Sequence, residues 1–122
     1  YSYSYDKKED KLTAVSNYNL PSKVQGVAFD DNGSIYLSTS YGRNNSSYLK
    51  VYSSLLSLDK KPNEPKVKVE MPPCSEEVAI ADGTVFVLFE SASAKYFEGT
   101  DGMGKSPAPI DKLLEVSVAS IW

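Results

Sequence analysis

Two similar stretches decide the fold: residues 24–38 read VQGVAFDDNGSIYLS, and residues 73–89 read PCSEEVAIADGTVFVLF. In each stretch, a short apolar run leads into a turn that contains Gly, and a second apolar run follows. In the first turn, Asn32-Gly33 can adopt the positive φ angles that a tight type I′ hairpin requires. We therefore expect two β-hairpins about 50 residues apart.

The rest of the chain also has the composition of short strands. Tyr, Val and Ser are abundant, and Gly, Pro, Asn and Asp separate runs of roughly strand length, while helix signals are weak. The predicted elements are a hairpin over residues 1–18, strands over 48–54, 66–71 and 113–118, a polar loop over 55–65 and a long loop over 91–109.

A hairpin that recurs after about 50 residues is typical of propeller blades, each of which has four antiparallel strands. We therefore predict an all-β fold of about two four-stranded antiparallel propeller-type blades. A propeller closes only with about four blades or more, so the chain is expected to be a fragment of a larger propeller. The predicted parts are the end of a preceding blade (1–21), one blade (22–73) and a final blade with a long loop at 91–109 (74–122).

The two stretches also carry a family resemblance. Residues 24–38 resemble the opening hairpin of a blade in the regucalcin, gluconolactonase and NHL-like group of six-bladed propellers. Residues 73–83 are similar, with Glu77 where that group usually has Gly. Residues 24–118 as a whole resemble the last two blades of an uncharacterised bacterial, often secreted, propeller protein. The resemblance implies a secreted or cell-envelope location, whereas a blade motif says little about activity.

Composition excludes several classes of function. Thirteen basic and sixteen acidic residues give a net charge of −3, and the basic residues form no stripe that could follow a nucleic-acid backbone. No apolar run approaches the roughly 20 residues needed to span a bilayer. The chain has no His and a single Cys, Cys74, which we expect to be a small packing residue. We predict no nucleic-acid partner, no membrane span and no catalytic residue.

The predicted partners supply the remaining blades. Exposed blade edges invite aggregation, so we expect a companion chain or identical copies of this chain to cover them. The chain begins at Tyr1 instead of Met, which favours a segment processed or cut from a longer protein.

Candidate site residues follow the second strand of each hairpin. Arg43, two residues after Tyr41, and Glu90 occupy these positions, so in a propeller they would face the same funnel as Glu76. An Arg–carboxylate pair there could bind a ligand carboxylate or join neighbouring blades, and the structural role is favoured. Tyr41, Arg43, Glu76, Glu77 and Glu90 are the ligand-binding candidates.

Glu76 is also the candidate metal ligand, because the lactonase group that the sequence resembles uses a Glu at this position to help hold a divalent cation. Calcium needs roughly six to eight oxygen ligands, and the chain offers only Glu76, Glu77, Glu90 and Asp101. A polar channel lining is the favoured interpretation, with calcium the one cofactor considered.

Residues 99–106, GTDGMGKS, match a phosphate-loop pattern. Pro107 and Pro109 follow at once and prevent the helix that a phosphate loop needs, so we predict a loop that binds no nucleotide.

Three hypotheses for the function follow. The leading one is a non-catalytic module that binds a ligand or a protein through the loops at 41–47, 71–75 and 91–109, since function often resides in loops. The alternatives are part of a metal-dependent lactonase-like hydrolase and a carbohydrate-binding ring of several copies.

Overall fold

The computed structural model describes residues 1–122, which form three antiparallel sheets. A hairpin of β1 (Ser2–Asp6) and β2 (Lys11–Ser16) stands at the N-terminus. The four-stranded sheet contains β3 (Val24–Phe29), β4 (Ile35–Thr39), β5 (Ser47–Tyr52) and β6 (Val67–Met71). The three-stranded sheet contains β7 (Ser75–Ala81), β8 (Thr84–Phe89) and β9 (Leu114–Ser117). The helices are α1 (Leu55–Lys60), α2 (Ala94–Phe97) and α3 (Val118–Ile121).

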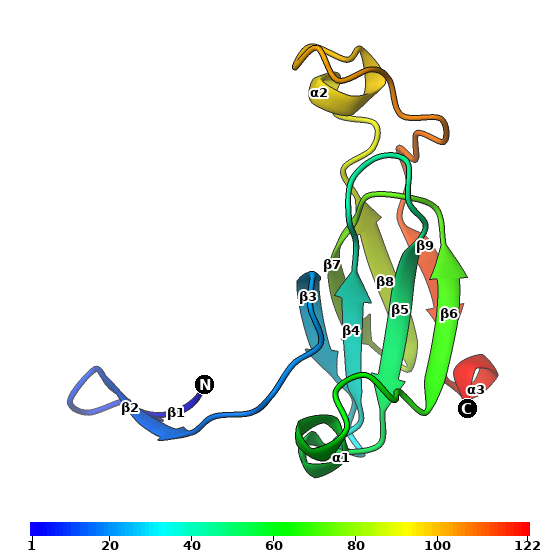
Figure 1. The fold of residues 1–122 in the computed structure, drawn as a ribbon. Coiled ribbons are helices and arrows are strands. Elements are labelled where there is room, and N and C mark those ends of the chain that lie inside the picture. Colours follow the sequence, from blue (N-terminus) through cyan, green and yellow to red (C-terminus); the bar gives the residue numbers. More distant parts are fainter.

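The two larger sheets pack face to face, with the strands in chain order within each sheet (Figure 1). The inner face of the four-stranded sheet carries Tyr36, Leu49 and Val51, and the inner face of the three-stranded sheet carries Val85 and Val87. These side chains alternate along their strands with residues of the opposite faces, as strand geometry requires. They form the main hydrophobic core, and Ile121 of α3 closes one end of it.

The outer face of the four-stranded sheet has a second, smaller core. Ile35, Leu37 and Tyr52 are buried there against Leu58 of α1. Ser54 caps this helix, because its hydroxyl accepts a hydrogen bond from the Ser57 backbone N–H at 3.1 Å. Residues 55–65 were predicted as a loop, and this prediction was wrong for 55–60: the six-residue helix buries Leu58 on the sheet.

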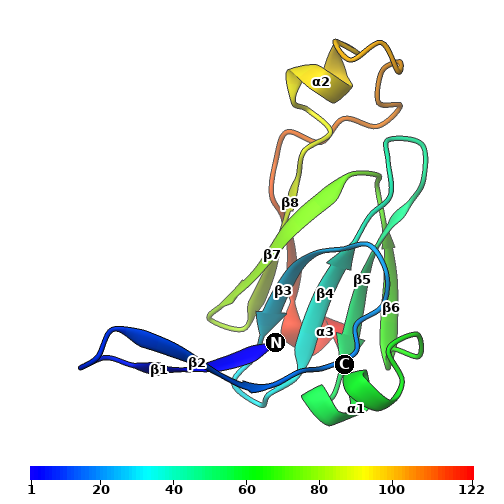
Figure 2. The ribbon, with the colours of Figure 1, turned by 60° about the vertical axis from the view of Figure 1, so that its left-hand side comes forward.

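The hairpin β1–β2 projects away from the two packed sheets (Figure 2). Every side chain of β1 and β2 is exposed except that of Ser2, which is half-buried. Isolated two-stranded hairpins are only marginally stable in water. The strands themselves agree with the predicted hairpin over residues 1–18.

The two hairpin turns differ from each other. In the first turn only Gly33 has a positive φ, of 79°, and the Asp30 carboxylate accepts hydrogen bonds from the Asn32 and Ser34 backbone N–H groups at 2.9 Å. The predicted type I′ turn at Asn32-Gly33 is therefore wrong. In the second turn Asp82 and Gly83 both have a positive φ, at 48° and 71°, as type I′ requires.

The all-β prediction is confirmed, but the sheets have four and three strands and neither is closed. The predicted strand over 113–118 ends at Ser117, where α3 begins. The loop over 91–109 contains the short helix α2. No helix has the length and apolar character needed to cross a membrane.

The two larger sheets repeat a local backbone feature. Lys23 and Cys74 precede β3 and β7, and both have a positive φ, of 65° and 67°. Their carbonyl groups accept equivalent hydrogen bonds, from the Ser40 N–H at 3.1 Å and the Glu90 N–H at 3.0 Å. A register shift follows in each strand, between Val24 and Gly26 and between residues 75 and 78. The two segments thus repeat in backbone conformation as well as in sequence.

Candidate functional site

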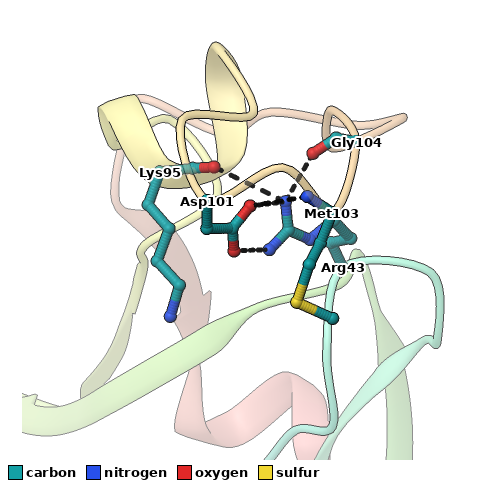
Figure 3. A network of polar contacts seen from close by, with 5 residues as sticks. All are labelled: Arg43, Lys95, Asp101, Met103 and Gly104. Atoms are coloured by element: carbon teal, nitrogen blue, oxygen red, sulfur yellow. Dashed lines mark hydrogen bonds and ion pairs between the residues drawn. The ribbon is translucent and has the colours of Figure 1, made fainter.

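The candidate site lies at the end of the two sheets where the loops over 41–47 and 91–109 meet (Figure 1). Arg43 belongs to the first loop and its side chain is buried. Its guanidinium forms a two-pronged ion pair with the Asp101 carboxylate, with N–O distances of 3.1 and 2.5 Å (Figure 3). The same guanidinium donates hydrogen bonds to the carbonyl groups of Gly104 and Lys95. Arg43 therefore connects the two loops.

Asp101 is the carboxylate partner of Arg43, in place of the predicted Glu90. The Asp101 carboxylate raises the pKa of Arg43, and the guanidinium holds the pKa of Asp101 below its usual value. Tyr96 of α2 adds a cation–π contact, with its ring centroid 4.6 Å from the guanidinium carbon. Arg43 therefore joins one loop to another within one chain, through Asp101 and Tyr96.

Residues 99–106, the phosphate-loop match, form the segment that folds over Arg43. Gly99, Gly102 and Gly104 all have a positive φ, which glycine adopts at no steric cost. No helix follows the segment, since the chain continues as loop to β9. A Cβ atom at Gly99 would lie 3.0 Å from the Gly104 carbonyl oxygen, so Gly99 also lets this loop fold closely on itself.

Glu76 and Glu90 lie close to each other, near the residues that surround Arg43. Burial raises the pKa of Glu76, and a hydrogen bond to Glu90 and repulsion from the Glu90 and Glu77 carboxylates raise it further. Lys95 acts in the opposite direction. The neighbouring Glu90 carboxylate also raises the pKa of Tyr96. The proximity of Glu90 thus favours the protonated form of Glu76, as a neighbouring carboxylate does.

The side chains around Glu76 offer few oxygen ligands of the kind that calcium needs. No group of three or more His, Cys, Asp or Glu side chains is placed to hold a metal ion. The Asp101 carboxylate is bound to Arg43, and Glu77 is exposed and accepts a hydrogen bond from the Val78 backbone N–H. Calcium requires several more oxygen ligands than the Glu76–Glu90 pair provides.

Cys74 is buried beside the same group of charges. Burial raises the pKa of its thiol, and the Glu90 carboxylate raises it further, whereas Arg43 lowers it. Because the thiolate is the nucleophilic form, this environment suits the predicted packing role.

Tyr41 lies apart from the Glu76–Glu90 pair and is exposed. Its side chain lines two adjoining cavities, of about 470 and 340 Å³. The smaller cavity reaches Arg43 and Asp101. The larger one opens on the outer face of the four-stranded sheet and is lined by Lys23, Lys50 and Tyr48 together with Ser, Thr and Asn side chains.

The sequence reasoning missed Lys50, which lines the larger cavity, and Lys68, which lies opposite Lys50. Lys50 alternates with Leu49 and Val51 along β5, and Lys68 alternates with Val67 and Val69 along β6. The alternation indicates that both lysines face away from the core, but only the strand register places them opposite each other.

Comparison with known proteins assigns no family to this arrangement. The chain matches no protein-family model, no curated protein and no solved structure.

Proposed function

We propose that the chain is a segment of about two propeller-type blades that acts as a non-catalytic binding module. The ligand or protein would be bound through the loops at 41–47, 71–75 and 91–109. The binding role is supported by two adjoining cavities at the loop end of the sheets. Tyr41 lines both of them. The larger cavity has a volume within the range of small-molecule sites.

The way the two sheets stack supports the propeller part of the proposal. Val78 and Ile80 of β7 pack into the core between the sheets. The equivalent residues of β3, Val27 and Phe29, lie on the outer face of the four-stranded sheet and are 50% and 53% exposed. A further sheet stacked in the same way would cover them. On the opposite faces of these strands the burial is reversed. Ala28 of β3 is buried against the three-stranded sheet, whereas its equivalent in β7, Ala79, is exposed.

Stacking of this kind is heterologous, because one face of a sheet meets the other face of the next. Repeated heterologous contacts close into a ring when the rotation permits it. The additional sheets would come from a companion chain or from copies of this chain.

Native mass spectrometry of the purified chain, with the denatured mass as control, tests the architecture. We expect a multiple of the 13.4 kDa chain mass, or a complex with a larger companion, and three copies if six blades close the ring. A stable folded monomer of 13.4 kDa would contradict the propeller proposal.

A second measurement tests the binding role. The ¹⁵N-labelled chain is titrated with a library of small molecules and oligosaccharides, and the backbone amide signals are followed by NMR. Binding compounds should shift the signals of Asn44 and Asn45, which line both cavities, and leave the β1–β2 hairpin unchanged. Compounds that bind only elsewhere, or no binding compound at all, would contradict the proposal.

A further inference from the structure

The larger cavity differs from the other hollows of the chain in its charge. It is the largest of them, at about 470 Å³, and it is lined by Lys23 and Lys50 but by no Asp or Glu. Neither lysine belongs to an ion pair, since the ion pairs of the chain are Arg43–Asp101 and Lys61–Glu64. The lining of the cavity therefore carries two lysines and no carboxylate.

A third lysine adds to this charge. Lys68 of β6 lies directly opposite Lys50 of β5. Like charges at opposite positions of neighbouring strands destabilise a sheet. Burial lowers the pKa of Lys50, and the neighbouring Lys68 lowers it further. Glu70, two residues along β6, accepts a hydrogen bond from the Ser46 hydroxyl and does not line the cavity. A bound anion would relieve the repulsion between the two lysines.

Two tyrosines hold lysine side chains at the cavity. The ammonium of Lys23 lies 2.9 Å from the ring centroid of Tyr41, and that of Lys68 lies 4.0 Å from the ring centroid of Tyr48. Cation–π contacts of this kind reduce the freedom of otherwise flexible side chains. The positive groups are thus partly positioned before any ligand binds.

The remaining lining groups are hydroxyls and side-chain amides, among them Thr39, Ser40, Asn44 and Asn45. Hydroxyls and amides both donate and accept hydrogen bonds, as the recognition of sugar hydroxyls requires. Lysine supplies a point charge for a carboxylate or a sulfate. The lining of the cavity combines lysine ammonium groups with hydroxyls and side-chain amides.

We propose that this cavity binds an acidic saccharide, with the carboxylate or sulfate of the ligand between Lys23 and Lys50 and its hydroxyls on the Ser, Thr and Asn side chains. The inference rests on the proposed binding role of the loop end and adds the chemical class of the ligand. The loop over 41–47 contributes Tyr41, Asn44, Asn45 and Ser46 to the cavity lining, and β5 contributes Tyr48 and Lys50.

The test compares two matched disaccharides: cellobiouronic acid, which carries one carboxylate, and cellobiose, which is neutral. Titration calorimetry at low ionic strength measures affinity, and NMR of the ¹⁵N-labelled chain locates the site. We expect cellobiouronic acid to bind at least about tenfold more tightly than cellobiose, since hydrogen bonds to charged groups exceed neutral ones by this order. The amide signals of Asn44, Asn45 and Lys50 should shift.

Variants identify the charges that matter. Lys50→Gln should weaken binding of cellobiouronic acid about tenfold and leave cellobiose unaffected. Lys23→Gln provides a second variant, on an exposed residue outside the strands, should the first fail to fold by circular dichroism. Lys7→Gln, on the projecting hairpin, is the matched control and should change nothing.

Three results would overturn the inference. Equal binding of the two disaccharides with shifts at Asn44 and Asn45 would reject the acidic class and leave the proposed binding role intact. Inorganic sulfate that binds as tightly as cellobiouronic acid would show an anion site without saccharide recognition. Absence of any shift with either disaccharide would reject the saccharide class, whereas the library titration separately decides the proposed function.

Discussion

At the residue scale, Gly26 shows how closely the two sheets approach. A Cβ atom at this position would lie 2.6 Å from the Glu77 carboxylate and 2.7 Å from the Val78 backbone nitrogen. The backbone atoms of β7 cannot move aside as a flexible side chain could. The residue aligned with Gly26 in the second repeat is Glu77, which is exposed and has no further sheet of this chain against it.

Gly26→Ala should destabilise the chain by about 1–3 kcal/mol, because the added methyl group pushes β3 away from β7. Urea unfolding followed by circular dichroism measures the loss. Gln25→Ala, at the exposed neighbouring position, is the control and should cost much less. An equal effect of both substitutions would argue against close packing at Gly26.

Glu76 gives a prediction about pH. Its pKa is raised in the folded state by burial and by Glu90, so the folded chain binds a proton that the unfolded chain releases. This contribution to stability is present below the unfolded pKa of about 4.5 and is lost as the pH rises through the folded pKa. Glu76→Gln should therefore raise the urea midpoint at pH 8 and change it little at pH 4. Glu115→Gln, on the exposed part of β9, serves as control. If Glu76→Gln raised the urea midpoint more at pH 4 than at pH 8, the assignment would be contradicted.

At the scale of elements, Arg43 joins the loop over 91–109 to the loop between β4 and β5. The backbone hydrogen bonds of this loop, such as the one from the Ser106 N–H to the Tyr96 carbonyl, are local and do not join it to the loop over 41–47. The ion pair that joins the two loops links residues 58 positions apart in the sequence.

Arg43→Met should release this loop. Because a hydrogen bond to a charged group contributes about 1.5–3 kcal/mol, amide hydrogen exchange in residues 98–106 should become roughly ten to a hundred times faster. Exchange in β4 and β8 should change little. Lys61→Met, which removes the exposed ion pair with Glu64, is the control. Unchanged exchange in 98–106 would show that other contacts hold the loop.

At the scale of the whole molecule, the apolar outer face of the four-stranded sheet is only partly covered. Residues of this face and of the N-terminal segment line an apolar cavity of about 230 Å³ that includes Val27, Phe29, Tyr18 and Leu20. The β1–β2 hairpin projects away from the packed sheets (Figure 2), and Val27 and Phe29 are half-exposed. The exposure fits the proposed stacking of a further sheet.

Phe29→Ser should weaken association, because it removes a half-exposed aromatic ring from the face that the further sheet would cover. We expect a shift of the native mass distribution toward 13.4 kDa, with the circular dichroism spectrum unchanged. Leu56→Ser, on the exposed side of α1, is the control of similar apolar loss. An unchanged mass distribution for Phe29→Ser would place the contact elsewhere.

The sequence by itself determined the strands and their repeat, because alternation of apolar side chains and turns with Gly are local signals. It placed β3, β4, β7 and β8 closely, and it missed α1, whose six residues carry only a weak helix signal until Leu58 meets the sheet. Tertiary structure alone decided that Arg43 pairs with Asp101 and that Lys50 faces Lys68. Such pairings depend on loop closure and strand register, which join residues far apart in the chain and leave no periodic pattern in the sequence.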